Sequence, residues 1–96
     1  MSRYNLIDED DLQEWLAIHE IWKRDDNKIT SEFVFDHFVQ AFGFMTAVAI
    51  LAEKHNHHPV IENHYNIVKL SMNTHDARNK ITNRDLTLAE AIEKIK

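Results

Sequence analysis

The sequence predicts an α+β domain in which a four-stranded antiparallel sheet carries its helices on one face. Apolar residues recur at helical spacing in three segments of the chain. Two further segments combine extended patterns with turn residues, which predicts two hairpins. The predicted order of elements is therefore α-β-β-α-β-β-α. A length of 96 residues suits one domain, so we treat residues 1–96 as a single unit with a loose terminus over residues 1–5.

The first helix is predicted over residues 8–19, where four acidic positions precede apolar residues at helical spacing. Acidic side chains in a first turn interact favourably with the positive end of the helix dipole. A hairpin is predicted over residues 22–35, because Asp25, Asp26 and Asn27 are residue types that favour turns. The strand after this turn places four side chains on one face: Ile29, Ser31, Phe33 and Phe35.

The longest predicted helix spans residues 36–55, and Asp36 is placed to cap its first turn. Gly43 costs roughly 1 kcal/mol relative to alanine inside a helix, which predicts close packing against another backbone. The helix must end before Pro59, because a proline disfavours the helical conformation of the residue before it. Apolar residues surround most of this helix, which predicts a central, buried element: Phe38, Ala41, Phe42, Phe44, Met45, Ala47, Val48, Ala49, Leu51 and Ala52.

The second hairpin is predicted over residues 60–74, with its turn at residues 63–66. Its second strand alternates apolar and polar residues, so one face should meet the core through Val68, Leu70 and Met72. Residues 76–81 are predicted to form a polar loop. Thr82 and Asp85 resemble a capping box, with aspartate in place of the usual glutamate, and begin the last predicted helix. The apolar residues of that helix are Leu86, Leu88, Ala89, Ile92 and Ile95.

Composition narrows the possible functions. The formal net charge of −5 disfavours direct binding to the phosphate backbone of DNA or RNA. The chain has no cysteine, which excludes disulfides, thiol catalysis and cysteine-based zinc sites. No apolar stretch approaches the ~18 residues that a membrane-spanning helix needs, and the first residues lack the apolar segment of a signal peptide. We therefore expect a cytoplasmic protein with no membrane partner and no direct nucleic-acid partner.

The segment EKHNHHPV, residues 53–60, holds three of the seven histidines. A transition-metal site usually needs three or four ligands. Neighbouring residues of a helix do not share a face, so His57 and His58 are not placed to bind one ion together, and no HExxH spacing occurs. We therefore expect no metal. For His55 the favoured interpretation is a solvated residue at a helix end, where histidine interacts favourably with the dipole.

Two interpretations of His57 and His58 stay open: solvated residues that end a helix, or functional side chains held by Pro59 at a rigid corner. Imidazoles titrate near neutral pH, and general acid–base catalysis needs a proton donor and a proton acceptor aimed at one substrate. His75 follows the alternating strand. If that strand extends far enough, His75 lies on the face opposite the core, where it is accessible to the corner.

Residues 41–76 resemble the pterin-4a-carbinolamine dehydratases, and residues 84–95 resemble the closing helix of that family. The family pattern is carried by nine positions in several separated elements: Glu53, His57, His58, Pro59, Tyr65, Asn66, Ser71, Thr74 and His75. The resemblance implies an α+β fold, a homodimer or homotetramer, and catalysis without a metal or an organic cofactor. It also implies dehydration of 4a-hydroxytetrahydropterin to quinonoid dihydropterin. That reaction recycles the cofactor of aromatic amino acid hydroxylases, which are the implied pathway partners.

The resemblance also implies roles for single residues. His57 and His75 would be the acid–base pair, and His58 would bind and orient the pterin. The remaining implied residues line or support the pocket: Asn56, Asn73, Thr74 and Asp76 as its lining, with Glu53 and Pro59 in support. The chain departs from the family pattern at several positions: Asn56 replaces a frequent aspartate, Ile61 a frequent aromatic residue, and Arg78 and Asn79 small residues.

Two other functions stay open. Members of the same family act as interaction partners that stabilise a transcription-factor dimer, so the chain could be a binding or assembly module. Other dehydratase-like proteins are linked to molybdopterin metabolism, which would keep the pterin and change the pathway.

Overall fold

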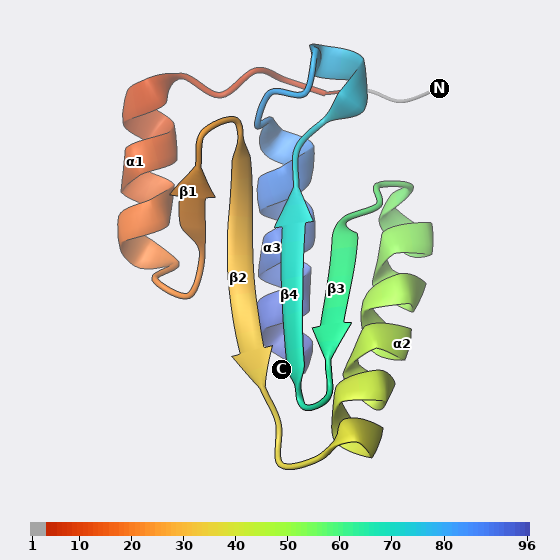
Figure 1. Cartoon of the computed structure of the whole chain (residues 1–96). Coiled ribbons are helices and arrows are strands. Elements are labelled where there is room, and N and C mark those ends of the chain that lie inside the picture. The colour runs from red at the N-terminus through yellow and green to blue at the C-terminus, as the bar shows by residue number, and fades with distance from the viewer. Residues whose placement is uncertain (1–3) are drawn as a thin grey trace.

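The computed structural model describes residues 4–96 as a four-stranded antiparallel sheet with three α-helices and one short 3-10 helix (Figure 1). The order of elements is α-β-β-α-β-β-α, which confirms the predicted α+β class. The elements are α1 Glu9–Ile18, β1 Lys23–Asp25, β2 Lys28–Val34, α2 Phe38–His55, β3 Val60–His64, β4 Ile67–Met72, the 3-10 helix η1 His75–Ala77, and α3 Asn83–Ile95.

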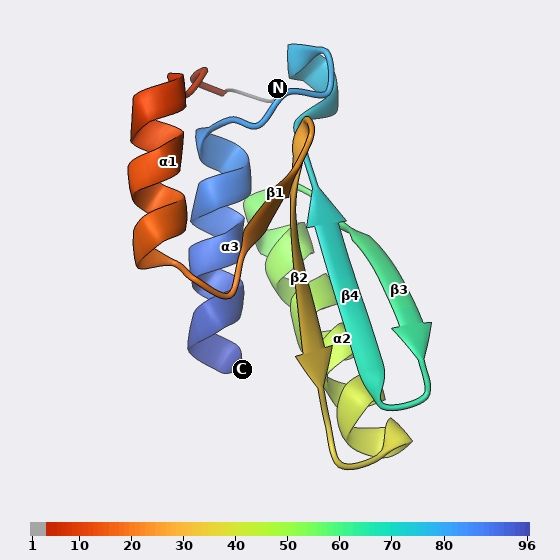
Figure 2. The same cartoon turned by 60° about the vertical axis from the view of Figure 1, so that its left-hand side comes forward.

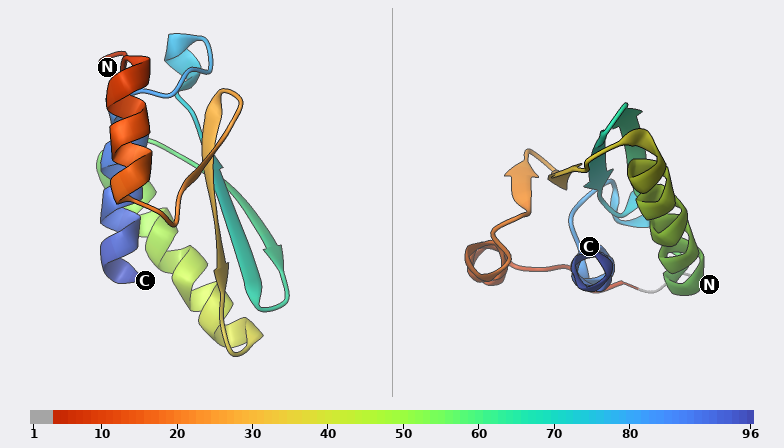
Figure 3. Two further views of the ribbon diagram at one scale, coloured as in Figure 1. Left: turned by 90° about the vertical axis from the view of Figure 1, so that its left-hand side faces the viewer. Right: turned by 90° about the horizontal axis from the view of Figure 1, so that it is seen from below.

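The helices form one layer and the sheet forms the other. The sheet has the strand order β1-β2-β4-β3, so the two hairpins join through β2 and β4 at its centre. All three α-helices cover the same face, as the end-on view of Figure 3 shows. Helices α1 and α3 run side by side (Figure 2), and α2 packs against α3 and β4. The predicted placement of helices on one face is confirmed.

The core lies between the central strands and the helices. The predicted alternation in β4 is confirmed, because Val68, Leu70 and Met72 are buried. The register places Phe33 opposite Val68 and Ile29 opposite Met72, so β2 and β4 present one apolar surface. Each such side chain contributes about 1.5–3 kcal/mol when fully buried. This surface holds β4 in place, and the segment after the end of β4 forms one wall of the site described below.

The start of α2 differs from the prediction. The N-cap is His37, whose Nδ1 accepts a hydrogen bond from the backbone N–H of Gln40 at 3.3 Å. Asp36 does not cap the helix; its backbone N–H instead donates to Gln40 Oε1 at 3.0 Å. The prediction of Asp36 as the cap is therefore wrong. The imidazole of His37, one position later, accepts from a backbone N–H of the first turn that has no partner within the helix.

The prediction of a central α2 buried on most sides is also wrong. The helix lies at one edge of its layer, so it buries a single side through Ala41, Phe44, Val48 and Ala52. Four apolar residues of the other side are exposed: Phe38, Val39, Phe42 and Ile50. A Cβ built on Gly43 meets no atom of the described residues within 4 Å, so the close packing predicted there is absent from this chain.

The segment between β4 and α3 is more compact than the predicted polar loop. β4 ends at Met72, so the strand does not extend to His75, and His75 instead begins η1. Ala77 and Ile81 are buried, which ties the segment to the core. The capping box of Thr82 and Asp85 is confirmed at the start of α3.

The predicted loose terminus falls partly on residues 1–3, which lie outside the described residues. Beyond them, the backbone N–H of Asn83 donates to Asn5 O at 3.1 Å, and Leu6 pairs with Thr82 in an isolated bridge. A helix that could cross a membrane, judged by length and apolar content, is not found within residues 4–96.

Candidate active site

The candidate site is a cleft of about 320 Å³ between the end of α2 and the end of β4. That volume falls within the usual range of small-molecule pockets, roughly 300–1,000 Å³. Every residue that lines it belongs to the set that the sequence predicted: Asn56, His57, His58, Asn73, Thr74, His75 and Asp76. Glu53 and Pro59 lie beside the cleft in the chain but do not line it.

The corner after α2 sends two neighbouring histidines in different directions. Asn56 ends the helix in the left-handed conformation, with φ 49° and ψ 47°, which asparagine adopts more readily than most residues. The backbone N–H of His57 still donates to Ala52 O at 3.0 Å. Pro59 then prevents a return to the helical conformation. As a result, the His57 side chain turns inward and the His58 side chain turns outward.

His57 is buried, with 8% of its surface exposed, and its Nε2 lies 2.5 Å from Oδ1 of Asp85. Asp85 comes from the first turn of α3 and is fully buried. Its second oxygen, Oδ2, accepts from the Thr74 hydroxyl at 2.9 Å and from the backbone N–H of Thr82 at 2.9 Å. The Thr74 and Thr82 hydroxyl oxygens lie 2.6 Å apart. This buried network therefore joins the α2 corner, the segment after β4 and the start of α3.

Asp85 is the functional residue that sequence reasoning missed. The sequence identified Asp85 as a helix cap, and the structure adds a second role as the partner of His57. The 28 positions between the two residues carried no local signal. The only hint in the sequence was the residue type at position 85. A capping box normally uses the longer glutamate or glutamine there, so an aspartate is unusual.

His58 and Glu53 form a pair at the rim of the cleft. His58 Nε2 lies 2.5 Å from Glu53 Oε2, and both side chains are more than half exposed. Glu53 lies in the last turn of α2, so this contact is local in the chain. An exposed pair of this kind contributes about 0–1 kcal/mol to stability. The pair can therefore orient the His58 ring without holding the fold together.

His75 is the most exposed of the three histidines that line the cleft. It begins η1, its side chain is 95% exposed, and its Nδ1 lies 3.8 Å from Asp76 Oδ1. The backbone oxygen of Asp76 accepts a hydrogen bond from the Tyr4 hydroxyl at 3.4 Å. The site thus combines one buried imidazole with a fixed partner and one exposed imidazole that is free to turn toward a ligand.

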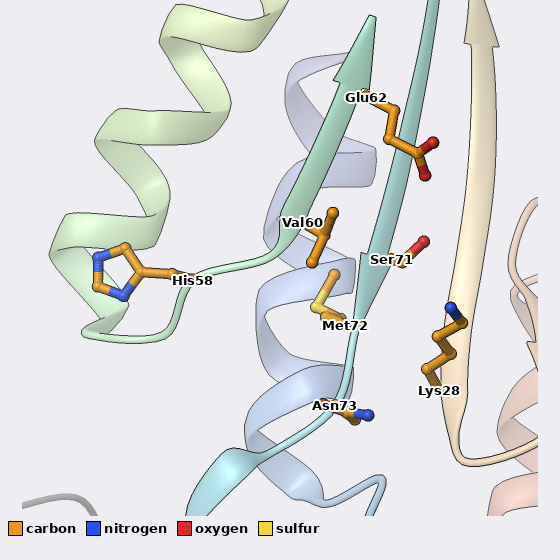
Figure 4. Close-up of a pocket in the computed structure, with 7 residues that line it drawn as sticks. All are labelled: Lys28, His58, Val60, Glu62, Ser71, Met72 and Asn73. Carbon is orange, nitrogen blue, oxygen red and sulfur yellow. The ribbon is translucent and has the colours of Figure 1, made fainter. Parts of the chain in front are cut away.

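A second hollow of about 230 Å³ adjoins the cleft and shares His58 and Asn73 with it. Lys28, Ser71 and Glu62 reach into it from three neighbouring strands, on the face of the sheet opposite the helices (Figure 4). Ile61, where the chain departs from the family pattern, lines neither the cleft nor this hollow.

The histidines of the cleft are side chains that can transfer protons. Two imidazoles facing one pocket can accept and donate a proton near neutral pH. Within residues 4–96 there is no cluster of three or more histidine, aspartate or glutamate side chains placed to hold a metal ion. Fold and cleft together describe an α+β protein with a histidine-lined cleft of the size of a small-molecule pocket.

Comparison with known proteins assigns the chain to a family. The family profile described as pterin 4 alpha carbinolamine dehydratase matches residues 5–95. The chain therefore belongs to this family, which confirms the resemblance predicted from the motifs.

Individual relatives agree with this assignment. Two proteins of Prochlorococcus marinus, each provisionally named a pterin-4-alpha-carbinolamine dehydratase, are similar over nearly the full length of both chains. The protein of strain NATL2A is 44% identical and covers 95% of each chain, and that of strain MIT 9312 is 47% identical, covering 99% of this chain and 97% of its own. A crystal structure described as a transcriptional coactivator/pterin dehydratase from Brucella melitensis superposes with a TM-score of 0.87 at 36% identity, over 95% of this chain and 98% of that chain.

Proposed function

We propose that this protein dehydrates 4a-hydroxytetrahydropterin to quinonoid dihydropterin, with His57 and His75 as the acid–base pair. The observation that carries the proposal is the pairing of a buried, hydrogen-bonded His57 with an exposed His75 in one small cleft. The two rings occupy unlike environments, which suits two unlike proton-transfer roles. Membership of the dehydratase family supports the same reaction.

The reaction needs two proton transfers, one to the substrate and one from it. The hydroxyl group must leave as water, so its oxygen needs a proton, and a ring N–H proton must be removed from the pterin. Each positioned acid or base typically contributes about 10²–10⁴-fold to the rate. The chemistry breaks one C–O bond and one N–H bond and forms one C=N bond, so no redox partner is needed.

We assign the other lining residues to substrate binding. His58 would anchor the pterin, with Glu53 orienting its ring from the end of α2. Asn56, Asn73, Thr74 and Asp76 would supply polar contacts from the two walls of the cleft. Pro59 would keep the corner fixed, because it blocks any continuation of α2.

The pathway belongs to the same proposal. Recycling of a tetrahydrobiopterin-type cofactor would make an aromatic amino acid hydroxylase the enzyme that supplies the substrate. The cytoplasmic location expected from the sequence also stays a prediction.

A dehydration assay with freshly generated 4a-hydroxytetrahydropterin tests the reaction. We expect an active wild type, a His75→Ala variant slowed about 100-fold or more, and an unchanged His64→Ala control. His64 suits this control because it ends β3, is exposed and does not line the cleft. Equal rates for wild type and His75→Ala would remove His75 from the mechanism. An inactive wild type would remove the proposed function.

We further propose that copies of the chain assemble into a homodimer or homotetramer. The exposed side of α2 supports this, because Phe38, Val39, Phe42 and Ile50 follow one another at helical spacing on the surface. Contiguous exposed apolar residues of this kind typically mark a protein interface, and closed homo-oligomers are the commonest assemblies. The described coactivator role of the Brucella relative makes an assembly module the second candidate function.

Light scattering on the purified chain tests assembly. We expect a mass of two or four chains, which Phe42→Glu should reduce and Ile18→Glu should not. Ile18 is a matched control, since it is apolar and exposed but lies on α1. A monomeric wild type would contradict homo-oligomerisation. A chain that assembles but does not dehydrate the pterin would favour the assembly module.

A further inference from the structure

We propose that Asp85 is a positioning residue that fixes the tautomer of His57, so that Nδ1 of His57 accepts the substrate proton. This inference rests on the proposed function, and it adds which ring nitrogen reacts and which residue decides it. It follows from the hydrogen-bond directions of the buried network.

Both ring nitrogens of His57 can be assigned from their surroundings. Nε2 lies 2.5 Å from Asp85 Oδ1 and shares one proton with it. The other oxygen of Asp85 accepts two hydrogen bonds, as a carboxylate does, so Asp85 is the acceptor in this contact and Nε2 is the donor. Nδ1 makes no hydrogen bond within the described residues, although the ring lines the cleft. In the neutral ring Nδ1 therefore carries the free lone pair and is the base.

The rest of the network supports an acceptor-only carboxylate. The single hydroxyl proton of Thr74 goes to Asp85 Oδ2, so the Thr82 hydroxyl, which accepts from the backbone N–H of Arg84, is the donor to Thr74. The Thr74 hydroxyl then donates to Asp85 Oδ2, and the backbone N–H of Thr82 donates to the same oxygen. All of these hydrogen bonds point toward Asp85. Three donors, counting His57, thus converge on one fully buried carboxylate.

The same carboxylate sets the spacing between the two walls of the cleft. Oδ1 holds His57 of the α2 corner, and Oδ2 holds Thr74 of the segment after β4. Both of these residues line the cleft, whereas Asp85 does not. Asp85 therefore acts through His57 and Thr74 and does not contact the substrate itself.

The proton balance of the reaction follows from this assignment. His57 Nδ1 takes the ring N–H proton of the pterin, and the released electron pair becomes the C=N bond. The C–O bond breaks, its electron pair leaves with the oxygen, and the acid of the pair protonates that oxygen to give water. His57 is then an imidazolium whose Nε2–H still donates to Asp85, so the carboxylate stabilises the charge that develops.

The Asp85→Asn variant tests the assignment, because an amide of the same shape reverses one hydrogen bond. Its oxygen can still accept from the Thr82 N–H and the Thr74 hydroxyl, which turns its NH₂ group toward His57 Nε2. Nε2 must then accept, and the His57 proton moves to Nδ1. We expect kcat to fall about 10²–10⁴-fold while KM changes by less than about 3-fold, as for the wrong tautomer in a catalytic triad.

Long-range ¹H–¹⁵N NMR of the histidine rings reads the tautomer directly. We expect a proton on Nε2 of wild-type His57 and on Nδ1 of the variant. Glu90→Gln is the matched control, because Glu90 is a carboxylate of α3 that contacts Trp15 instead of the site. It should keep both the wild-type tautomer and the wild-type rate.

Two results would overturn the assignment. One is a wild-type His57 that carries a proton on Nδ1 at neutral pH, and the other is an Asp85→Asn variant with an undiminished kcat. The wild-type spectrum decides the tautomer even if the variant does not fold. An inactive wild type with the expected tautomer would refute the proposed reaction and leave the role of Asp85 in place.

Discussion

The two sides of the α2 corner differ in how their histidines are held. On the inner side, His57 is bound by Asp85, which is bound in turn by Thr74 and Thr82, so several distant elements fix one ring. On the outer rim, His58 hydrogen-bonds to the nearby Glu53, and His75 lies beside the adjacent Asp76. We therefore expect inner substitutions to alter both stability and rate, and rim substitutions to alter binding or rate alone.

The largest expected effect comes from His57→Ala on the inner side. The change leaves a buried carboxylate without its main partner and opens a small cavity. We expect a loss of about 3 kcal/mol, the upper end of the usual cost of leaving a buried polar group without a hydrogen-bond partner, because the acceptor is a carboxylate although two other donors to it remain. The dehydration rate should also fall by about 10²–10⁴-fold.

Urea unfolding and the dehydration assay measure these two effects separately. His75→Ala is the rim counterpart, and its unfolding free energy should stay within about 0.5 kcal/mol of the wild type, as for other surface changes. If both variants lost the same stability, the distinction between the inner side and the rim would fail.

Thr74→Val is the next largest change and removes only the hydroxyl from the inner network. Asp85 Oδ2 loses one donor and the Thr82 hydroxyl loses its acceptor. We expect a loss of about 1–3 kcal/mol, the usual cost of leaving buried polar groups without partners. The rate should fall less than in Asp85→Asn, because the contact between Asp85 and His57 survives. A larger rate loss in Thr74→Val would mean that Thr74, not Asp85, positions the base.

The sequence predicted the outer rim better than the inner side, for a physical reason. Rim contacts join residues close in the chain, such as Glu53 and His58, so motif spacing carries them. The contact between His57 and Asp85 exists only because α3 packs beside the end of α2, which is a product of the whole fold. The resemblance to the family named the cleft residues but not the carboxylate behind them.

In the fold, too, features that depend on nearby residues were predicted better than features that depend on tertiary packing. Alternation in β4 and the capping box of α3 are local signals, and both were predicted correctly. The burial of helix α2 was not predicted correctly. Apolar residues lie around most of its circumference, so periodicity cannot tell which side meets the core. The end of β4 at Met72 could not be predicted either, because residues 73–75 are polar and include no glycine or proline to mark the end of a strand before η1 begins.

Glu53→Gln tests the rim with a smaller expected effect. The variant keeps the shape of the side chain and removes its charge, so His58 loses a charged hydrogen-bond partner at the edge of the cleft. Stability should change by less than about 1 kcal/mol, since both groups are exposed to solvent. We expect KM to rise several-fold with little change in kcat, because His58 is assigned to binding. A loss confined to kcat would instead place His58 in proton transfer.

The smallest expected effect lies at an exposed pair far from the cleft, where Arg24 hydrogen-bonds to Glu9. The Arg24 guanidinium holds the pKa of the Glu9 carboxyl below its usual value of 4.5, with a further hydrogen bond from Gln13. A lowered carboxyl pKa contributes stability at pH values above 4.5, and that contribution is lost as the pH falls through the lowered pKa. The stability difference between wild type and Glu9→Gln should therefore be largest at neutral pH and shrink in acid.

Urea midpoints measured at neutral and acidic pH, each in low and high salt, detect this small term. Salt should reduce the difference at neutral pH, because exposed charges are screened. The dehydration rate of Glu9→Gln should equal that of the wild type at every pH, since Glu9 lies on α1 away from the cleft. A rate effect here as large as that of Glu53→Gln would show that a charge changes the rate wherever it lies on the surface, and the rim of the cleft would then have no special role.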